Sequence, residues 1–217
     1  NIEAETFMKK IRFPFAVGYG MTECGPLISY APWTVNKIGA SGRKVDTLEV
    51  IIDSPDPSRV VGEIVLRGEN CMTGYYKNPE ATREVIDDEG WLHTGDLGLI
   101  DKDGFIFIKG RCKSLILGSN GKNIYPEEIE AAINNKEYVN ESLVVYRQEK
   151  LVALIYPDSD KMTANGVTKE ALPEILEHYR KEVNAGMPKF MQVSRFEVHP
   201  EEFVKTPKRS IKRYLYN

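Results

Sequence analysis

Short apolar segments separated by glycine and proline turns dominate the first half of the chain and restrict it to a β-rich fold. Leu48–Ile52 and Glu63–Arg67 mix apolar and β-branched residues, as strands do. Asp53–Pro57 lies between them with two prolines and two aspartates, which predicts a turn. Gly98–Ile108 has apolar runs on both sides of Asp-Lys-Asp-Gly, which predicts a β-hairpin.

The second half changes to an alternation of helices and strands. Pro126–Asn134 begins with proline and two glutamates, as a helix N-terminus does. Thr168–Ala185 places apolar side chains on one face at helical spacing. Three strands are expected beside these helices, at Leu143–Tyr146, Val152–Tyr156 and Gln192–Val198. The order α-β-β-α-β predicts a small α+β domain with a short antiparallel sheet.

Composition excludes several classes of protein. The longest apolar run, Leu151–Tyr156, is far shorter than the ~20 residues that a membrane span needs. Asn1–Lys10 carries glutamates and lysines where a secretory signal needs an apolar stretch. A net charge of −3, from 29 basic and 32 acidic residues, argues against a dedicated nucleic-acid binder. Three widely spaced cysteines, Cys24, Cys71 and Cys112, indicate reduced thiols and a cytoplasmic protein.

One glycine-rich segment, Gly18–Pro26 (GYGMTECGP), carries more polar groups than a turn requires. Glycines flank Tyr19 on both sides, and the second, Gly20, lets the backbone turn tightly and approach a ligand. The hydroxyl of Thr22 and the carboxylate of Glu23 follow, a combination that suits a phosphate and its magnesium ion. An ordinary glycine turn is the alternative, and for Gly-x-Gly alone it is the favoured one.

Three further segments contain candidate ligand-binding groups. Asp96 is an acid in the otherwise apolar, glycine-bearing Gly90–Gly98, where it can hold two vicinal ribose hydroxyls or bond its own turn. His93 has no cysteine, histidine or acid at metal-ligand spacing, so we expect a structural role. Arg111 comes directly after an expected strand, and its planar guanidinium can donate several hydrogen bonds in a fixed geometry. Lys205–Arg213 has five basic residues and no acid, which predicts a solvated surface or an anion clamp.

Five segments, in this order, resemble the adenylate-forming (AMP-forming) acyl-CoA synthetase superfamily. They are YGMTE, GEIVLRGENCMTGYYKNPEAT, GWLHTGDLG, KGRCKSLI and GKNIYPEEIE. The tail, KTPKRSIKRYLY, is most similar to long-chain fatty acid–CoA ligases. The resemblance implies that a carboxylate attacks the α-phosphate of MgATP, and that the thiol of coenzyme A then displaces AMP from the acyl-adenylate. ATP, magnesium and coenzyme A are the expected cofactors, and a fatty acid or another carboxylic acid is the expected substrate.

The resemblance also implies a role for individual residues. Tyr19, followed by Gly20, stacks on the adenine. Thr22 hydrogen-bonds the α-phosphate and Glu23 binds the magnesium ion. Asp96 takes both ribose hydroxyls.

The same resemblance implies a mobile C-terminal domain. Arg111 reaches the ribose or phosphate, and Lys113 lies at the hinge about which the small domain alternates between the two half-reactions. The loop Leu117–Lys122 then faces the active site and lines the coenzyme A channel. We expect an α+β fold: the closing β-rich segment of the large adenylating domain, then a small α+β domain. The expected boundaries are 1–110 for the large-domain segment, 111–113 for the hinge and 114–217 for the small domain.

The tail departs from the family where the adenylating lysine belongs. Aligned on a motif resembling T-P-x-x-K-x-K-R, Ser210 takes the lysine's place. An ammonium ~4 Å from an oxyanion contributes about 4 kcal/mol at an effective dielectric near 20, which a serine cannot supply. Three interpretations stay open. Lys208 or, slightly favoured, Lys212 stands in, because an extended segment puts both on the face of Ser210; Arg209 serves through a register shift; or the first half-reaction is impaired.

No run such as S-G-T-T-G-x-P-K, the family's phosphate loop, occurs in the sequence. In the family that loop lies far upstream, together with most of the acyl pocket. We therefore expect the C-terminal part of a longer fatty acid–CoA ligase, and no adenylation by the 217 residues alone. The alternatives are a ligase for an aryl, medium-chain or short-chain acid, and a non-catalytic nucleotide-binding relative. A nonribosomal adenylation domain is less favoured, and peripheral membrane contact stays open.

Overall fold

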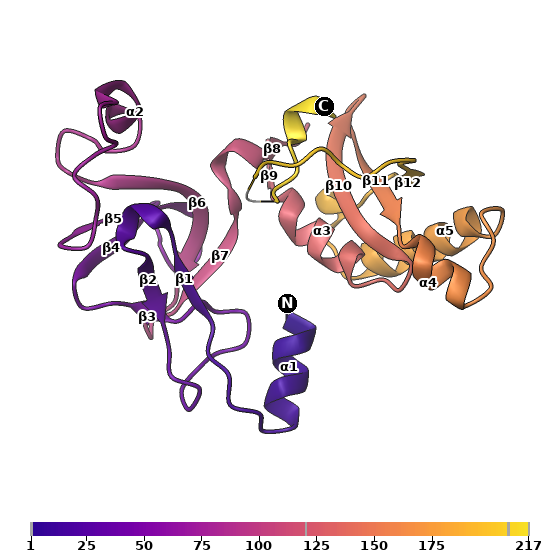
Figure 1. Cartoon of the computed structure of the whole chain (residues 1–217), viewed down its shortest axis with the longest axis horizontal. Helices are drawn as coiled ribbons and strands as arrows, with labels where there is room; N and C mark the ends of the chain where they lie inside the picture. The colour runs from indigo at the N-terminus through magenta and orange to yellow at the C-terminus, as the bar shows by residue number, and fades with distance from the viewer. Residues whose placement is uncertain (1, 120, 208, 217) are drawn as a thin grey trace. The chain divides into compact units, whose positions relative to one another are not determined.

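The computed structural model describes residues 2–119, 121–207 and 209–216 and divides the chain into two compact units. Unit 1 is Asn1–Lys113 and unit 2 is Ser114–Asn217. Figure 1 shows the short strands of unit 1 and the helices and strands of unit 2. Each unit has a hydrophobic core of its own.

Unit 1 consists mainly of two small antiparallel sheets. The first has the order β1-β2-β3, and the second is the meander β4-β5-β6-β7. Two short helices and a 3-10 turn at Thr22–Cys24 complete the unit. The elements are α1 (Ile2–Lys10), β1 (Gly18–Gly20), β2 (Leu27–Tyr30), β3 (Arg43–Lys44), β4 (Leu48–Asp53), β5 (Gly62–Gly68), α2 (Pro79–Arg83), β6 (Leu92–Ile100) and β7 (Ile106–Arg111).

Alternating side chains determine how the meander packs. In β4, Leu48, Val50 and Ile52 are buried while the residues between them are exposed, as the period of two requires. The hairpin predicted over Gly98–Ile108 is confirmed as β6 and β7. Its turn is held by Asp101, whose carboxylate accepts the backbone N–H groups of residues 103 and 105.

The α+β class of unit 2 is confirmed, and its predicted order of helices and strands recurs with three additions: β8 and β9 before the first helix, and the short helix α4 before α5. The helix predicted over Thr168–Ala185 begins later, at Leu172, with Pro173 in its first turn. The elements are β8 (Ile116–Leu117), β9 (Asn123–Ile124), α3 (Pro126–Asn134), β10 (Val139–Arg147), β11 (Lys150–Pro157), α4 (Ser159–Ala164), α5 (Leu172–Ala185) and β12 (Arg195–Val198).

The sheet of unit 2 differs from the prediction in one strand. β10 and β11 form an antiparallel hairpin, but β12 pairs with β11 in parallel. The helices α4 and α5 lie between β11 and β12 in the sequence, and such a crossover returns the chain in the same direction. The sheet is therefore mixed and not wholly antiparallel.

Both faces of this sheet are buried. Val144, Ala153 and Ile155 pack in the core that contains α3 and α5, whereas Leu143 and Val152 pack in a second core that contains Phe203 of the tail. Burial on both faces explains why β11 is the longest apolar run of the sequence. None of the helices that the structure describes is long and apolar enough to cross a membrane.

Candidate functional site

Three residues predicted to contact nucleotide meet around one carboxylate in unit 1. Asp96 of β6 accepts a hydrogen bond from the Tyr19 hydroxyl at 2.6 Å. Its other oxygen accepts one from Arg111 Nη1 at 2.7 Å. The sheet sets this geometry, because Asp96 and Arg111 are direct partners in the β6–β7 register. Strands far apart in the sequence thus bring a phenol, a carboxylate and a guanidinium together.

Burial differs within this cluster in a way that suits a ligand. Asp96 is 8% exposed and Tyr19 is 9% exposed, whereas the Arg111 side chain is 58% exposed. Burial, followed by the hydrogen bond to Asp96, raises the pKa of the Tyr19 hydroxyl. The phenol is therefore a neutral donor to the carboxylate at ordinary pH, and the exposed guanidinium is accessible to a ligand.

The glycine turn after Tyr19 is required by a close backbone approach. A Cβ at Gly20 would lie 2.0 Å from the carbonyl oxygen of Pro26, so a larger residue does not fit. The turn leads into the 3-10 segment that begins at Thr22, which is exposed. Glu23 accepts a hydrogen bond from the Tyr75 hydroxyl at 3.0 Å, a contact that sequence spacing did not reveal. The segment therefore presents a hydroxyl and a carboxylate on consecutive residues.

Asp96 is carried by a bulge in β6. Val65 pairs with His93 and Glu63 with Leu97, so β6 has more residues than β5 over this stretch. Gly95, in the bulge, has φ +70°, a left-handed conformation that favours glycine. Its N–H donates to Glu63 Oε1 at 2.8 Å.

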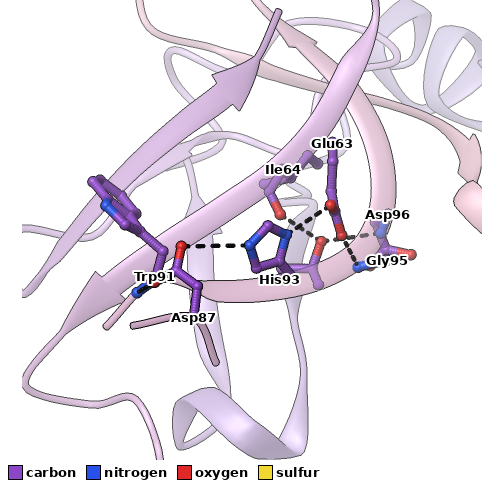
Figure 2. Close-up of polar contacts among 8 residues, drawn as sticks. Glu63, Ile64, Asp87, Trp91, His93, Gly95 and Asp96 are labelled. Carbon is purple, nitrogen blue, oxygen red and sulfur yellow. Dashed lines mark hydrogen bonds and ion pairs between the residues drawn. The ribbon is translucent and has the colours of Figure 1, made fainter. Parts of the chain in front are cut away.

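His93 has acidic partners that the sequence analysis did not find. Figure 2 shows its ring between Glu63 and Asp87. Nδ1 lies 2.8 Å from Glu63 Oε2, and Nε2 lies 3.6 Å from Asp87 Oδ2. Glu63 is 30 positions away in the sequence, so local spacing could not reveal it. Among the described residues, no group of three histidines, cysteines or acids could hold a metal ion.

The tail forms a tight turn, so the extended geometry assumed for it is wrong. Arg209 N–H donates to the carbonyl of Thr206 at 2.9 Å, and Thr206 N–H donates to that of Ser210 at 2.8 Å. Arg209 has φ +61°. The alternation assumed for this segment is therefore interrupted at Arg209. Lys208 itself lies outside the described residues.

The basic residues of the tail differ in whether they form ion pairs with acidic residues. Lys205 pairs with Glu141 at 2.5 Å and also with Glu202, and Arg213 pairs with Glu130 at 2.7 Å. Lys212 is half-buried and has no ion pair with any residue that the structure describes. The tail is thus anchored on both sides of Lys212.

The expected hinge residue lies where the two units meet in the sequence, and the expected loop lies near the start of unit 2. Lys113 lies in a 3-10 turn, Cys112–Ser114, and unit 1 ends at Lys113. Leu117–Lys122 forms the turn between β8 and β9, closed by a Gly118 N–H to Lys122 carbonyl bond of 2.9 Å, and Asn120 within it lies outside the described residues.

Two family models match most of the chain. The model for AMP-binding enzymes matches residues 1–76, and the model for the AMP-binding enzyme C-terminal domain matches residues 113–216. The 4-coumarate–CoA ligase 1 of Oryza sativa subsp. japonica is 42% identical over 158 residues, which are 66% of this chain and 27% of the relative. The long-chain-fatty-acid–CoA ligase of Salmonella typhimurium is 39% identical over 150 residues, 67% of this chain and 26% of the relative.

The structure also resembles a solved enzyme. O-succinylbenzoate coenzyme A synthetase from Bacillus subtilis, in complex with AMP, aligns with a TM-score of 0.80 at 25% identity. The alignment covers 100% of this chain and 43% of that protein. A second structure of that enzyme contains ATP and a magnesium ion. The chain spans between 26% and 35% of the length of the curated relatives that it matches.

The two family matches lie in the family's order along the chain, and the relatives named above are acid–CoA ligases. The chain therefore belongs to the AMP-binding enzyme family, within the superfamily of AMP-forming acyl-CoA ligases.

Proposed function

We propose that the chain is part of an ATP-dependent, AMP-forming fatty acid–CoA ligase. The observation that carries the proposal is the buried Asp96 carboxylate, held between the Tyr19 hydroxyl and the Arg111 guanidinium. A carboxylate accepts hydrogen bonds only, so it suits a pair of ribose hydroxyls. The matched share of the relatives supports a longer enzyme, in which these 217 residues alone are inactive.

In this proposal unit 1 binds the nucleotide. Asp96 accepts hydrogen bonds from the ribose hydroxyls, and Arg111 donates to the ribose or to a phosphate. Tyr19 stacks on the adenine, and Gly20 follows it in β1 as part of the same binding segment. Thr22 donates to the α-phosphate. Glu23 is a hard oxygen ligand of the kind magnesium prefers, and the ion neutralises charge on the phosphates when bound. The B. subtilis relative bound to ATP and magnesium supports these cofactors.

In this proposal unit 2 contributes to both half-reactions, with Lys212 in adenylation and Leu117–Lys122 in thioester formation. The hinge is at 111–113, with Lys113 at its centre, between a large-domain segment at 1–110 and the small domain at 114–217. A short 3-10 turn suits such a hinge, because few residues absorb the backbone change. Leu117–Lys122 then lines the channel through which coenzyme A attacks the acyl-adenylate.

A fatty acid is the proposed substrate. The Salmonella typhimurium relative is named for long-chain fatty acids, while the rice relative is named for 4-coumarate, so similarity alone leaves the acid open. ATP–pyrophosphate exchange by the intact protein, with a panel of long-, medium- and short-chain fatty acids and aryl acids, tests the choice. We expect exchange with long-chain acids; exchange with aryl acids alone would contradict the fatty acid assignment. The cytoplasm is the proposed location, supported by three free cysteines, and nucleic acid is not a proposed partner.

Lys212 is the proposed stand-in for the missing adenylating lysine. Like Arg209, it has no ion pair with any residue that the structure describes, and its backbone N–H donates to the Val204 carbonyl at 2.8 Å. We expect Lys212→Ala in the intact protein to reduce pyrophosphate release at least tenfold, because the ammonium contributes on the order of 4 kcal/mol near an oxyanion. Lys181→Ala, on an exposed lysine of α5, is the control. If release survives the Lys212 and Lys208 substitutions singly, the stand-in hypothesis is wrong.

Ser210 favours one second candidate, a nucleotide-binding relative that does not adenylate. That candidate predicts AMP binding without pyrophosphate exchange for any acid in the panel. The two candidates therefore differ in a single assay on the same protein.

A further inference from the structure

A continuous set of polar contacts connects His93 to the backbone that carries Asp96 (Figure 2). The link is the carboxylate of Glu63, whose side chain is 22% exposed. One oxygen accepts the Gly95 N–H at 2.8 Å, and the other faces His93 Nδ1 at 2.8 Å. One acid thus holds both the bulge and the imidazole.

The bulge has two other anchors, and both involve Thr94. Thr94 Oγ1 donates to the Ile64 carbonyl at 2.7 Å and accepts the Asp96 N–H at 3.0 Å. Thr94 therefore fixes the backbone on either side of the glycine, while Glu63 fixes the glycine itself. Because Gly95 has a left-handed φ, loss of the Glu63 contact frees a residue with many accessible conformations. The direction of the next side chain, Asp96, depends on this residue.

The protonation state of His93 determines how many hydrogen bonds its ring donates to the neighbouring acids. Both ring nitrogens face carboxylates, Glu63 on β5 and Asp87 on the turn before β6. A neutral imidazole has only one N–H, so it presents a lone pair to one of the two acids, whereas the imidazolium donates to both. The hydrogen bond to Glu63 is the main cause that raises the pKa of His93 above its usual value, and Asp87 adds to it.

Charged and titratable groups lie near both ends of this set. Arg67 interacts electrostatically with Asp87 and Glu89 at one end, and Cys112 and Arg111 lie toward Asp96 at the other. The Cys112 thiol is under the electrostatic influence of Glu63 and Asp96, and burial is the main cause that raises its pKa. Arg111 bonds Asp96 from β7, and its Nη2 lies 3.7 Å from the position that a Cβ on Gly95 would take.

We propose that Glu63 and His93 are positioning residues that hold the Gly95 bulge and so direct the Asp96 carboxylate toward the ribose, most firmly when His93 carries its proton. The proposal rests on the proposed function of Asp96. Since the pKa of His93 is raised, the imidazolium contribution is complete below the ordinary histidine pKa of about 6.5 and is lost as the pH rises through the folded-state value. Nucleotide binding should weaken over the same interval.

The first test measures AMP affinity of the intact protein by calorimetry from about pH 5.5 to about pH 8.5. In the unsubstituted protein we expect the dissociation constant to rise roughly threefold to tenfold across this range, as for a lost charge-assisted hydrogen bond. His93→Gln should bind weakly throughout and lose this pH dependence. His178→Gln, on an exposed histidine of unit 2, is the matched control and should retain it. An unchanged affinity and slope in His93→Gln would overturn the proposal.

Glu63→Gln separates positioning from a merely structural role. The amide oxygen can still accept the Gly95 N–H, but the charge that stabilises the imidazolium is gone. We expect the His93 titration to move to lower pH and the midpoint of AMP affinity to move with it. A fall in affinity with an unmoved midpoint would contradict the proposed link.

A readout without nucleotide keeps the proposal and the proposed function distinguishable. With 15N-glycine labelling, the Gly95 amide resonance should titrate with the His93 pKa in the unsubstituted protein and stay fixed in His93→Gln. If the Gly95 resonance does not titrate with the His93 pKa, the proposal is wrong whether or not the protein binds AMP. A resonance that follows His93 in a protein that does not bind AMP refutes the proposed function alone.

Discussion

Asp96 combines burial with charge, and its two donors stabilise it in different ways. Tyr19 contributes a buried neutral hydroxyl, and Arg111 contributes an exposed cation. A carboxylate in this environment needs its hydrogen bonds, because an unsatisfied buried acceptor is costly.

Tyr19→Phe tests that stabilisation at the residue scale. The substitution removes the donor at 2.6 Å from Asp96 and leaves the ring in place. We expect the free energy of unfolding to fall by about 1–3 kcal/mol, as measured by urea denaturation. Tyr30→Phe, on a tyrosine that is 50% exposed, is the control and should change it by less than about 0.5 kcal/mol. Equal effects of the two substitutions would show that the hydroxyl of Tyr19 does not stabilise the fold.

Sequence reasoning selected Asp96, Tyr19 and Arg111 but missed the partners that surround them. The three were found because each lies in a short local motif. Glu63 and Asp87 were missed as partners of His93, since strand register and a turn bring them to it. Contacts set by register are not visible in local spacing.

At the scale of elements, the tail covers one face of the β10–β11 hairpin and is anchored by Arg213. The guanidinium donates to Glu130 of α3 at 2.7 Å and to the Val144 carbonyl at 3.3 Å. Glu130 also accepts the Val144 N–H at 2.6 Å. One pair of side chains thus ties together α3, β10 and the tail beside Lys212.

Arg213→Ala should destabilise unit 2 strongly. It leaves the Glu130 carboxylate, whose side chain is 12% exposed, without its cation. Removing one partner of a buried ion pair costs about 3–5 kcal/mol, which urea denaturation of the protein would detect. Arg195→Ala breaks the half-exposed pair with Glu197 instead, and should cost about 1 kcal/mol or less. A cost for Arg213→Ala no larger than this control would show that the tail is held by its apolar contacts alone.

The positions of the helices and strands were easier to predict than the pairing and direction of the strands. Pro126–Asn134 was predicted with its observed bounds because proline and two glutamates mark its start. The parallel direction of β12 was missed, because strand direction follows from the crossover and not from the composition of the strand. The turn in the tail was missed since a run of basic residues gives no strong turn pattern apart from its one proline.

At the scale of the whole molecule, the chain consists of two units with separate cores that meet at Lys113 in the sequence. Unit 1 contains the Asp96 cluster, and unit 2 contains the tail with Lys212. In the proposed ligase, this division would let the nucleotide-binding groups of unit 1 serve both half-reactions while unit 2 contributes different groups to each.

The most direct test of the proposed function compares Asp96→Asn with the unsubstituted intact protein in fatty acid-dependent ATP–pyrophosphate exchange. Asparagine keeps the size of the side chain but removes the charge that accepts the ribose hydroxyls. Hydrogen bonds to a charged group contribute about 1.5–3 kcal/mol each, so kcat/KM for ATP should fall at least about tenfold. Asp103→Asn, in the exposed β6–β7 turn, is the control and should leave exchange unchanged. Exchange that is absent from the unsubstituted protein with every acid, or that is unaffected by Asp96→Asn, would contradict the account.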